Sequence, residues 1–336
     1  MRCRAAGIQS ARHRSTSRRS SLSNAGAPHP GLRSYALFAL VCLIFSTTWL
    51  GIRISLDELP PLGSAGVRYL IAAPILFALA RVRRLPWPAS AREWRLPLLL
   101  GLTMFAIPFA LIYTAERTVP SGLTAVLFAP HAIFVAILAH IWLPDERLTP
   151  VRVLGVLGGF AGVLILFADR LSAHASWLGE TAVLLTGLIQ ATSSILVRRF
   201  LRATPAIVLS CIGTSVGAVV LLLASLLFER GSWHPASAGA WLAVLYLAVF
   251  GSVIAFTVTI RLLHDLGANR VAMSVYVTPA LALIWGALFR GEAIGPWLLA
   301  GTALIVFGVA LTSLSGPRAA APVQARASSA PASRHE

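Results

Sequence analysis

The sequence predicts an all-α integral membrane protein of ten transmembrane helices, arranged as two inverted repeats of five helices each. Three observations lead to this prediction. The chain is 57% hydrophobic and only 12% charged, whereas a soluble domain carries roughly a quarter of charged residues. Ten apolar runs follow one another along the 336 residues. A motif that precedes the fifth run recurs before the tenth.

Each apolar run is about 18–25 residues long, the length that a helix needs to cross a hydrocarbon core of about 30 Å. A segment in lipid has no water to satisfy its backbone N–H and C=O groups, so each run must be helical. The predicted helices cover residues 34–55, 62–80, 96–115, 121–143, 151–169, 177–197, 204–228, 238–262, 268–290 and 294–315.

The duplicated motif reads Glu, three residues, Pro, four residues, Gly. The offset between its two copies is 292 − 146 = 146 residues, and a pattern at a fixed long offset indicates an internal duplication. Because five helices are an odd number, the second repeat must cross the membrane in the opposite sense to the first, as in many secondary transporters. The members of the motif are Glu146, Pro150 and Gly155 in one copy and Glu292, Pro296 and Gly301 in the other.

Each motif marks the start of the last helix in its half. A negative charge is stabilised by the N-terminal end of a helix dipole, and Pro is favoured in the first helical turn. We therefore interpret Glu146 and Glu292 as structural start signals rather than transport residues. The glycines that follow, at Gly155-xxx-Gly159 and Gly158-xxx-Gly162, predict a close approach between helices.

The arginines predict the orientation of the chain. All 28 basic residues are Arg; 22 lie in segments on the side of the N-terminus and four on the other side. By the positive-inside rule, both termini are cytoplasmic. The net charge of +16 is explained by this topology, and without an aromatic-interleaved basic patch it does not predict a nucleic-acid partner.

The chain therefore divides into two repeats, residues 34–170 and 177–315, and two tails. Residues 1–33 carry seven Arg and no acidic residue, without the apolar region of a secretory signal. We interpret them as a disordered basic cytoplasmic tail, with an organelle transit peptide as the alternative. Residues 316–336 are rich in Ala, Pro, Ser and Arg and predict a second disordered tail.

Two small polar clusters accompany the duplicated motif: Ser46-Thr-Thr-Trp49 in the first predicted helix and Thr192-Ser-Ser194 in the sixth. With the ten-helix count, they make residues 34–315 similar to the EamA-type drug/metabolite transporter (DMT) family. The resemblance implies a carrier in the bacterial inner membrane that exports small metabolites, such as amino acids, their toxic analogues or drugs. It also implies a central cavity lined by the first four helices of each half, with the last helices used for packing or for a homodimer.

Two ionisable side chains inside the predicted helices are candidates for substrate binding, because such groups are costly in lipid. Arg68 could bind a substrate carboxylate with its guanidinium fork, or it could pair structurally with Asp57, Glu58 or Glu116. His131 could bind substrate or carry a proton, or it could hydrogen-bond to a neighbouring helix.

Hydroxyl, amide and aromatic side chains recur in the early helices of both halves. Such groups can recognise a polar substrate when they face each other across a cavity; the alternative for each is interhelical hydrogen bonding or packing. The further candidates for substrate binding are Thr47, Thr48, Trp49 and Tyr113 in the first half and Gln190, Ser193, Ser194 and Tyr276 in the second.

No motif predicts a cofactor or a metal site, since the sequence has no P-loop, HExxH or GxGxxG and its three cysteines lack ligand spacing. Gly213-Thr-Ser215-Val-Gly217 matches the nucleophile elbow of hydrolases, but it lies in an apolar run without a His or Asp partner. We expect a helix contact there rather than an intramembrane hydrolase. The alternatives to an exporter are a membrane scaffold or sensor without flux, and an organellar nucleotide-sugar or phosphate carrier.

Overall fold

The computed structural model describes residues 32–119, 124, 127–166, 176–278, 280–281 and 296–314. These residues form a bundle of helices and contain no strand. Six of the helices are long and apolar enough to cross a membrane, and three shorter apolar helices lie in the predicted fourth, fifth and tenth spans. The fourth, fifth, ninth and tenth predicted spans extend beyond the described residues, so ten spans stay a prediction.

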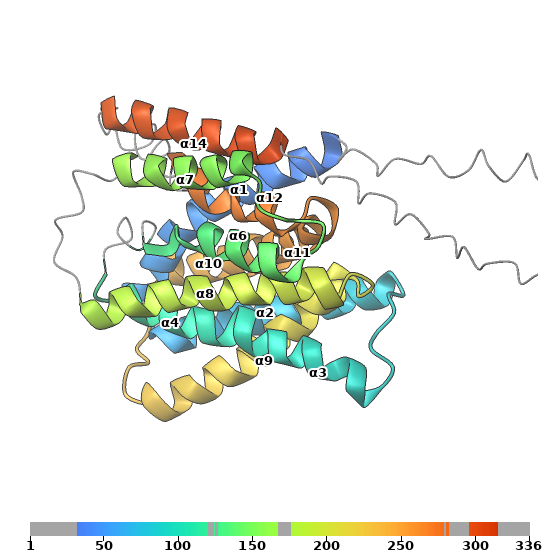
Figure 1. Ribbon diagram of the computed structural model, residues 1–336. Helices are drawn as coiled ribbons and strands as arrows, with labels where there is room; N and C mark the ends of the chain where they lie inside the picture. Colours follow the sequence, from blue (N-terminus) through green and yellow to red (C-terminus); the bar gives the residue numbers. More distant parts are fainter. Residues whose placement is uncertain are drawn as a thin grey trace, which may run out of the picture.

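The helices are arranged as a bundle of nearly aligned rods, with α7 and α14 forming one side of it (Figure 1). In chain order they are α1 (Leu32–Leu56), α2 (Pro61–Val82), α3 (Ala91–Leu100), η1 (Gly101–Ala106), α4 (Ile107–Ala115), α6 (His131–Trp142), α7 (Pro150–Leu166), α8 (Trp177–Phe200), α9 (Ala206–Phe228), α10 (Ala238–Tyr246), η2 (Leu247–Ile254), α11 (Ala255–Asp265), α12 (Ala268–Ala272) and α14 (Pro296–Leu314).

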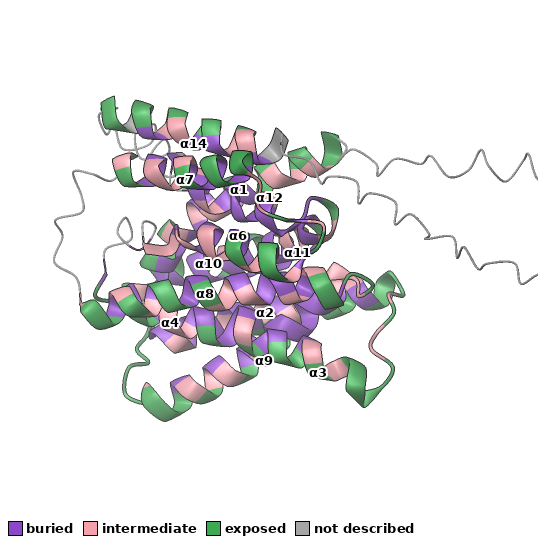
Figure 2. Cartoon of the chain, in the orientation of Figure 1, coloured by how far each residue is buried: buried purple, intermediate pink, exposed green. Residues whose placement is uncertain are grey.

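The outer surface of the bundle is apolar. Figure 2 shows buried residues along the centre and exposed residues on the outward faces of the helices. Many of the exposed residues are large and hydrophobic, among them Leu70 at 54%, Leu154 at 64% and Leu226 at 58% of full exposure. A soluble monomer rarely exposes such an extended apolar surface, whereas in lipid it needs no protein cover. The surface therefore agrees with the membrane location predicted from composition.

The third span begins earlier than predicted, at Ala91 instead of residue 96. The reason is a capping box at its N-terminus. The Ser90 hydroxyl accepts a hydrogen bond from the Glu93 backbone N–H at 3.3 Å, and the Glu93 carboxylate accepts one from the Ala89 backbone N–H at 2.9 Å. The first bond satisfies a donor that the first helical turn leaves unpaired, and the second fixes the chain that enters the helix, so the helix extends beyond its apolar part.

Two π-helical segments occupy equivalent places in the two halves. One is η1, inside the third span, and the other is η2, inside the span that joins α10 to α11. Their first residues, Gly101 and Leu247, are 247 − 101 = 146 residues apart, which is the offset of the duplicated motif. π-segments are rare and often lie at functional sites. The duplication therefore extends to an irregularity of the backbone that periodicity does not reveal.

The last helices of the two halves, α7 and α14, pack against each other through glycines and run antiparallel. Gly155 lies against Gly308, and Gly162, two turns later in α7, lies against Gly301, two turns earlier in α14. α7 begins at Pro150, as the duplicated motif predicts, and the described part of α14 covers Pro296–Leu314. Glu292 lies outside the described residues.

A second pair of repeat-related helices, α2 and α9, also runs antiparallel. Gly66 contacts Leu222, and Tyr69, farther along α2, contacts Gly217, which comes earlier in α9. Gly217 thus makes the helix contact expected of it. Ser215 lies within the continuous helix α9 with an exposed side chain, not at a turn between a strand and a helix. The opposite directions of two related pairs agree with an odd number of spans per repeat.

We predict that alanine substitutions at two glycines of the α7–α14 pair change the stability of the protein very differently. A methyl group added at Gly308 would lie 2.5 Å from the Gly155 carbonyl oxygen, whereas one added at Gly158 would have its nearest neighbour at 4.0 Å. Gly308→Ala should therefore destabilise the protein by about 1–3 kcal/mol through overpacking. Gly158→Ala, the matched control, should be neutral or stabilising by up to about 1 kcal/mol. Thermal unfolding in detergent checks both, and equal midpoints for the two variants would contradict this packing.

Candidate functional site

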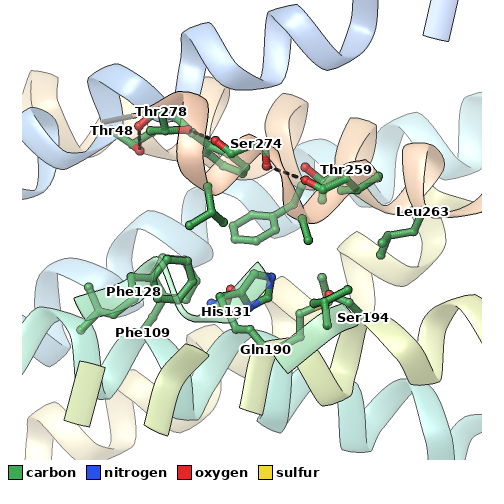
Figure 3. A pocket seen from close by; sticks show the side chains of 18 of the residues that line it. Thr48, Phe109, Phe128, His131, Gln190, Ser194, Thr259, Leu263, Ser274 and Thr278 are labelled. Carbon is green, nitrogen blue, oxygen red and sulfur yellow. Dashed lines mark hydrogen bonds between the residues drawn. The ribbon is translucent and has the colours of Figure 1, made fainter. Parts of the chain in front are cut away.

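A cavity of about 130 Å³ lies between the two halves of the chain. Its walls come from α1, α2, η1, α4 and α6 of the first half and from α8, α11 and α12 of the second. Figure 3 shows Thr48 and Thr278 on one side of the cavity and His131 and Gln190 on the other. The polar residues that line it are Thr48, Arg68, His131, Gln190, Ser194, Thr259, Ser274 and Thr278.

Equivalent positions of α1 and α8 both face this cavity. Phe45 and Trp49 line it from α1, and Gln190 and Ser194 line it from α8. Each pair is separated by 145 residues, since 190 − 45 and 194 − 49 both equal 145. The side chains differ while the positions correspond, so the duplication brings an aromatic wall opposite a polar one.

Two repeat-related aromatic rings meet at the cavity. Phe109 of α4 and Phe256 of α11 both line it, and their ring centroids are 5.6 Å apart at an interplanar angle of 71°. This edge-to-face arrangement is a favourable one for aromatic pairs. Because the two residues occupy corresponding places in the halves, their contact marks the region where the halves meet.

Arg68 lines the cavity from α2 and is almost fully buried, at 2% exposure. Its Nε donates a hydrogen bond to the Ser252 hydroxyl at 2.7 Å, and its Nη1 donates one to the Tyr113 hydroxyl at 3.3 Å. The guanidinium carbon lies 5.0 Å from the centroid of the Phe109 ring and 5.5 Å from that of Tyr69. All of these neighbours are neutral, and none of the ion pairs in the described residues includes Arg68.

Ser252 reaches Arg68 because it belongs to the π-segment η2. Its hydroxyl donates to the Leu247 carbonyl oxygen five residues earlier at 3.1 Å, which leaves its lone pairs for the Arg68 Nε. Gly251 lies directly against the Arg68 Nη2, where a side chain would collide with it. The irregular backbone of η2 thus builds the pocket that holds the guanidinium group.

His131 is the first residue of α6, after a turn at Ala129 and Pro130 that interrupts the predicted fourth helix. Its Nδ1 donates to the Gly187 carbonyl oxygen of α8 at 3.0 Å. A carbonyl oxygen only accepts, so Nδ1 carries a hydrogen and the neutral ring leaves Nε2 as an acceptor. The ring stacks on Phe128 with centroids 5.2 Å apart. His131 therefore links two helices and also lines the cavity.

Several polar groups that line the cavity have no hydrogen-bond partner among the described residues. Neither the Gln190 amide nor the Ser194 hydroxyl makes a hydrogen bond to any described residue. The Thr259 hydroxyl is buried without a partner. Buried polar atoms are usually hydrogen-bonded, and those that are not need an explanation. A bound polar molecule would supply the missing partners.

The four remaining predicted residues lie behind the cavity wall. The Thr47 hydroxyl is paired with the Tyr246 hydroxyl, and the Ser193 hydroxyl donates to the Thr103 hydroxyl at 2.9 Å. Tyr113 supports Arg68, as described above. The Tyr276 ring packs on Gly159 of α7, and its hydroxyl has no partner. In this structure these side chains hold the helices that carry the lining residues.

The sequence did not predict five residues of the site, which come from η2, α11 and the segment after α12. Four of them line the cavity and Ser252 holds Arg68: Ser252, Phe256, Thr259, Ser274 and Thr278. Each is a small polar or aromatic residue within a long apolar run, which is a weak signal because many such residues only bond their own helix. Ser274 and Thr278 do so, donating to Val271 and Ser274 carbonyl oxygens at 2.8 and 2.7 Å.

A cluster of charged residues, here called the Glu146 cluster, ties the two halves together beside the cavity. It consists of Asp145, Glu146, Arg198, Arg202 and the backbone of 267–269. The Glu146 carboxylate accepts from the Ala268 N–H at 2.9 Å, from the Asn269 N–H at 3.0 Å and from the Arg198 Nε at 3.1 Å. Ala268 also lines the cavity, so the cluster lies directly next to it.

The structure gives Glu146 a role that differs from the predicted start signal. Its carboxylate caps the N-terminus of α12 in the other half, not that of α7, which follows it in sequence. Gly267 makes this possible, because its φ of 88° suits glycine and a β-carbon there would lie 2.6 Å from the Glu146 Oε1. Arg198 adds a bond to the His264 carbonyl oxygen at 2.6 Å. The motif therefore joins the repeats as well as preceding a helix.

Comparison with known proteins agrees with this architecture. The EamA-like transporter family matches residues 32–168 and again residues 177–314. The uncharacterized inner membrane transporter YedA of Escherichia coli K12 is 31% identical over 83% of this chain and 90% of its own length. PagO of Salmonella typhimurium is 27% identical over 82% of this chain and 91% of its own. One crystal structure matches with a TM-score of 0.68 at 24% identity, over 84% of this chain and 96% of its own, which supports the fold.

We predict that the Glu146 cluster is a major contributor to stability. Glu146 and Arg198 have side chains only 7% and 12% exposed, so Glu146→Gln removes a buried anion from the guanidinium group and from the two backbone N–H groups that it binds. The expected loss is on the order of 3 kcal/mol. Asp145 contacts the same arginine but is 39% exposed, so Asp145→Asn, the matched control, should cost roughly 1 kcal/mol or less. Thermal unfolding in detergent gives both values, and a smaller loss for Glu146→Gln than for Asp145→Asn would contradict the prediction.

We predict that the stability of the protein depends on pH through Glu116, which lies just beyond the end of α4. Both of its carboxylate oxygens are buried without a hydrogen-bond partner. Burial raises the pKa of this carboxyl group from 4.5 to about 8, although the nearby Arg53 opposes the shift. The folded chain thus keeps a proton that the unfolded chain releases above about 4.5, so this contribution is complete below about 4.5 and is lost as the pH rises through about 8.

The test is thermal unfolding in detergent as a function of pH. The side chain of Gln in Glu116→Gln is uncharged at every pH. This variant should therefore lose less stability than the wild type as the pH rises from about 7 into the alkaline range. Asp265→Asn is the control, because Asp265 is partly exposed, at 37%, and pairs with Arg261 instead of Arg53. It should keep the wild-type profile. Parallel profiles for the wild type and Glu116→Gln would show that Glu116 is already ionised in the folded protein.

Proposed function

The chain belongs to the EamA-like transporter family and is a membrane transporter, and on this premise we propose that it is a secondary transporter that exports small metabolites. Amino acids, related compounds and drugs are the substrates to test first. The observation that supports the proposal is the cavity between the two halves, whose lining combines aromatic rings with polar groups that have no hydrogen-bond partner in the described part of the chain. Small-molecule sites in proteins have this composition.

We propose that transport proceeds by alternating access between two inverted five-helix repeats. Substrate sites of inverted-repeat transporters lie at the repeat interface, and access changes as one repeat moves against the other. The position of the cavity and the antiparallel packing of α2 with α9 and of α7 with α14 support this mechanism. In such a cycle the Glu146 cluster closes the cavity at the end of the bundle where α8 and α11 finish, and it must separate when that end opens.

The protein is a multi-pass inner membrane protein, and the arginine distribution supports an orientation with both termini in the cytoplasm. The Glu146 cluster then lies on the cytoplasmic side. No Asp or Glu lines the cavity among the described residues, so His131 is the titratable group there that could carry a proton. Uncoupled transport and proton exchange are both compatible with this site, and comparing flux with and without a pH gradient separates them.

The proposal is tested by expression and by reconstitution. A host that overexpresses the protein should gain resistance to toxic amino-acid analogues or drugs, which would reveal both the direction and the substrate class. Proteoliposomes containing the purified chain should then move the same compound. A chain that changes neither growth nor flux for any of these compounds would instead act as a scaffold or sensor, and the transporter mechanism proposed here would fail.

Two truncations on the same helix sharpen this test. Gln190 lines the cavity with an amide that has no hydrogen-bond partner among the described residues, and Leu188 lies on the exposed face of α8 at 41% exposure. Gln190→Ala removes one hydrogen bond to substrate and should weaken transport roughly two- to tenfold. Leu188→Ala should leave transport within experimental error of the wild type. Equal rates for all three proteins would remove Gln190 from the substrate site.

A further inference from the structure

We propose that the substrate carries one carboxylate, which binds to Arg68, and an apolar body, which lies among the aromatic side chains of the cavity. This inference rests on the proposed function, because it assigns a substrate class to the same cavity. It follows from the charge of Arg68, from the way its guanidinium group is held, and from the other residues that line the cavity.

None of the acidic side chains in the described residues forms an ion pair with Arg68. Of the three acids expected to pair with it, Asp57 lies 3.8 Å from Arg53, and the Glu58 carboxylate accepts hydrogen bonds from Ser237. The Glu116 carboxylate makes no hydrogen bond. A charge removed from water without a counter-ion is costly. The structural ion pair that the sequence left open is therefore absent from the described residues, and a bound anion would supply the missing counter-ion.

The guanidinium group of Arg68 is held in place and still has N–H donors without a partner among the described residues. Nε and Nη1 are fixed by the hydroxyls of Ser252 and Tyr113. Nη2 makes no hydrogen bond to the described residues, and Arg68 lines the cavity. A guanidinium group has five N–H donors, of which these two hydroxyls use two. The remaining donors suit a carboxylate, which accepts from a planar fork at two oxygens.

The described residues that line the cavity carry a net charge of one positive unit. Among the described lining residues, Arg68 is the single arginine and there is no Asp or Glu. One fixed positive charge balances one negative charge, so a monocarboxylate is matched and a phosphate dianion is only half compensated. An amine without a carboxylate finds no anion among the described lining residues and is repelled by Arg68. The site therefore favours an organic monoanion over a cation of the same size.

The aromatic residues that line the cavity indicate that the rest of the ligand is apolar. Phe109 lies against the guanidinium group and contacts Phe256, and both rings line the cavity. An apolar body next to the carboxylate would pack on these rings and remove their surface from contact with water. With a volume of about 130 Å³ in this conformation, the cavity favours a small apolar body. A small aliphatic carboxylate meets both requirements.

The experiment compares ligands that share one carbon skeleton. Purified full-length protein in detergent is titrated with isovalerate, isoamyl alcohol, isoamylamine and isoamyl phosphate, and binding is followed by intrinsic tryptophan fluorescence, since Trp49 lines the cavity. Isovalerate should bind roughly ten- to hundredfold more tightly than isoamylamine, because only the anion gains charge-assisted hydrogen bonds. It should also bind more tightly than the alcohol and the phosphate ester.

Two substitutions test the residue itself. Arg68→Gln should lose roughly ten- to hundredfold in isovalerate affinity and little in affinity for the alcohol, whereas Arg68→Lys should retain the preference for the anion. If Arg68→Gln does not fold, the ligand series on the wild type still decides the question. Binding of the amine or the alcohol as tight as that of isovalerate overturns the proposal, as does unchanged isovalerate binding to folded Arg68→Gln. Tighter binding of the phosphate ester overturns the choice of carboxylate.

These outcomes separate this inference from the proposed function. Flux of other solutes in proteoliposomes, without a preference for isovalerate in the binding series, would leave the transporter in place and remove the carboxylate site. Binding of isovalerate that depends on Arg68, without flux of any solute, would leave the site in place and remove the transporter.

Discussion

Backbone hydrogen bonding in lipid is the constraint on which this structure depends. A spanning segment must pair its own N–H and C=O groups, and non-helical backbone is tolerated only where it is buried in protein or lines a cavity. The irregular places of this chain obey that rule. The π-segment η1 contributes Met104 to the cavity wall, the turn before His131 presents that residue to the cavity, and the turn at Gly267 precedes the lining residue Ala268. These three departures from regular helix thus gather around the cavity between the halves.

The duplication supplies a symmetric frame, and single substitutions make the site asymmetric. Corresponding helices pair through glycines, and corresponding phenylalanines meet at the cavity. The charge, however, belongs to one half. The place in α9 that corresponds to Arg68 is at Gly213, 145 residues later, which packs against Phe105 and leaves no room for a long side chain. One half therefore provides the cation, while the other provides Ser252, which holds it in place.

Sequence reasoning reached the membrane class, the repeat and six of the residues that line the cavity, because hydropathy and a fixed offset are long-range signals. It could not place the two π-segments, because the residues around them are nearly all apolar and the change of helical register leaves no visible mark in the sequence. It could not rank the polar residues either. Thr48 and Ser193 occupy equivalent positions and resemble each other chemically, yet only Thr48 lines the cavity, because Ser193 bonds to Thr103 of η1. That distinction depends on how α1 and α8 are rotated about their axes, which the sequence of neither repeat reveals.

The matched positions of η1 and η2 also bear on the history of the chain. A π-segment is an uncommon feature, and here two of them begin 146 residues apart, at corresponding places in the two halves. A single origin explains this more simply than two. In that account the widened turn already existed in a half-length ancestor, before its gene was copied and the copies were joined. A shorter protein of that kind would have formed its cavity by pairing two identical chains in opposite orientations, and the present asymmetry around Arg68 arose only after the fusion allowed the two halves to differ.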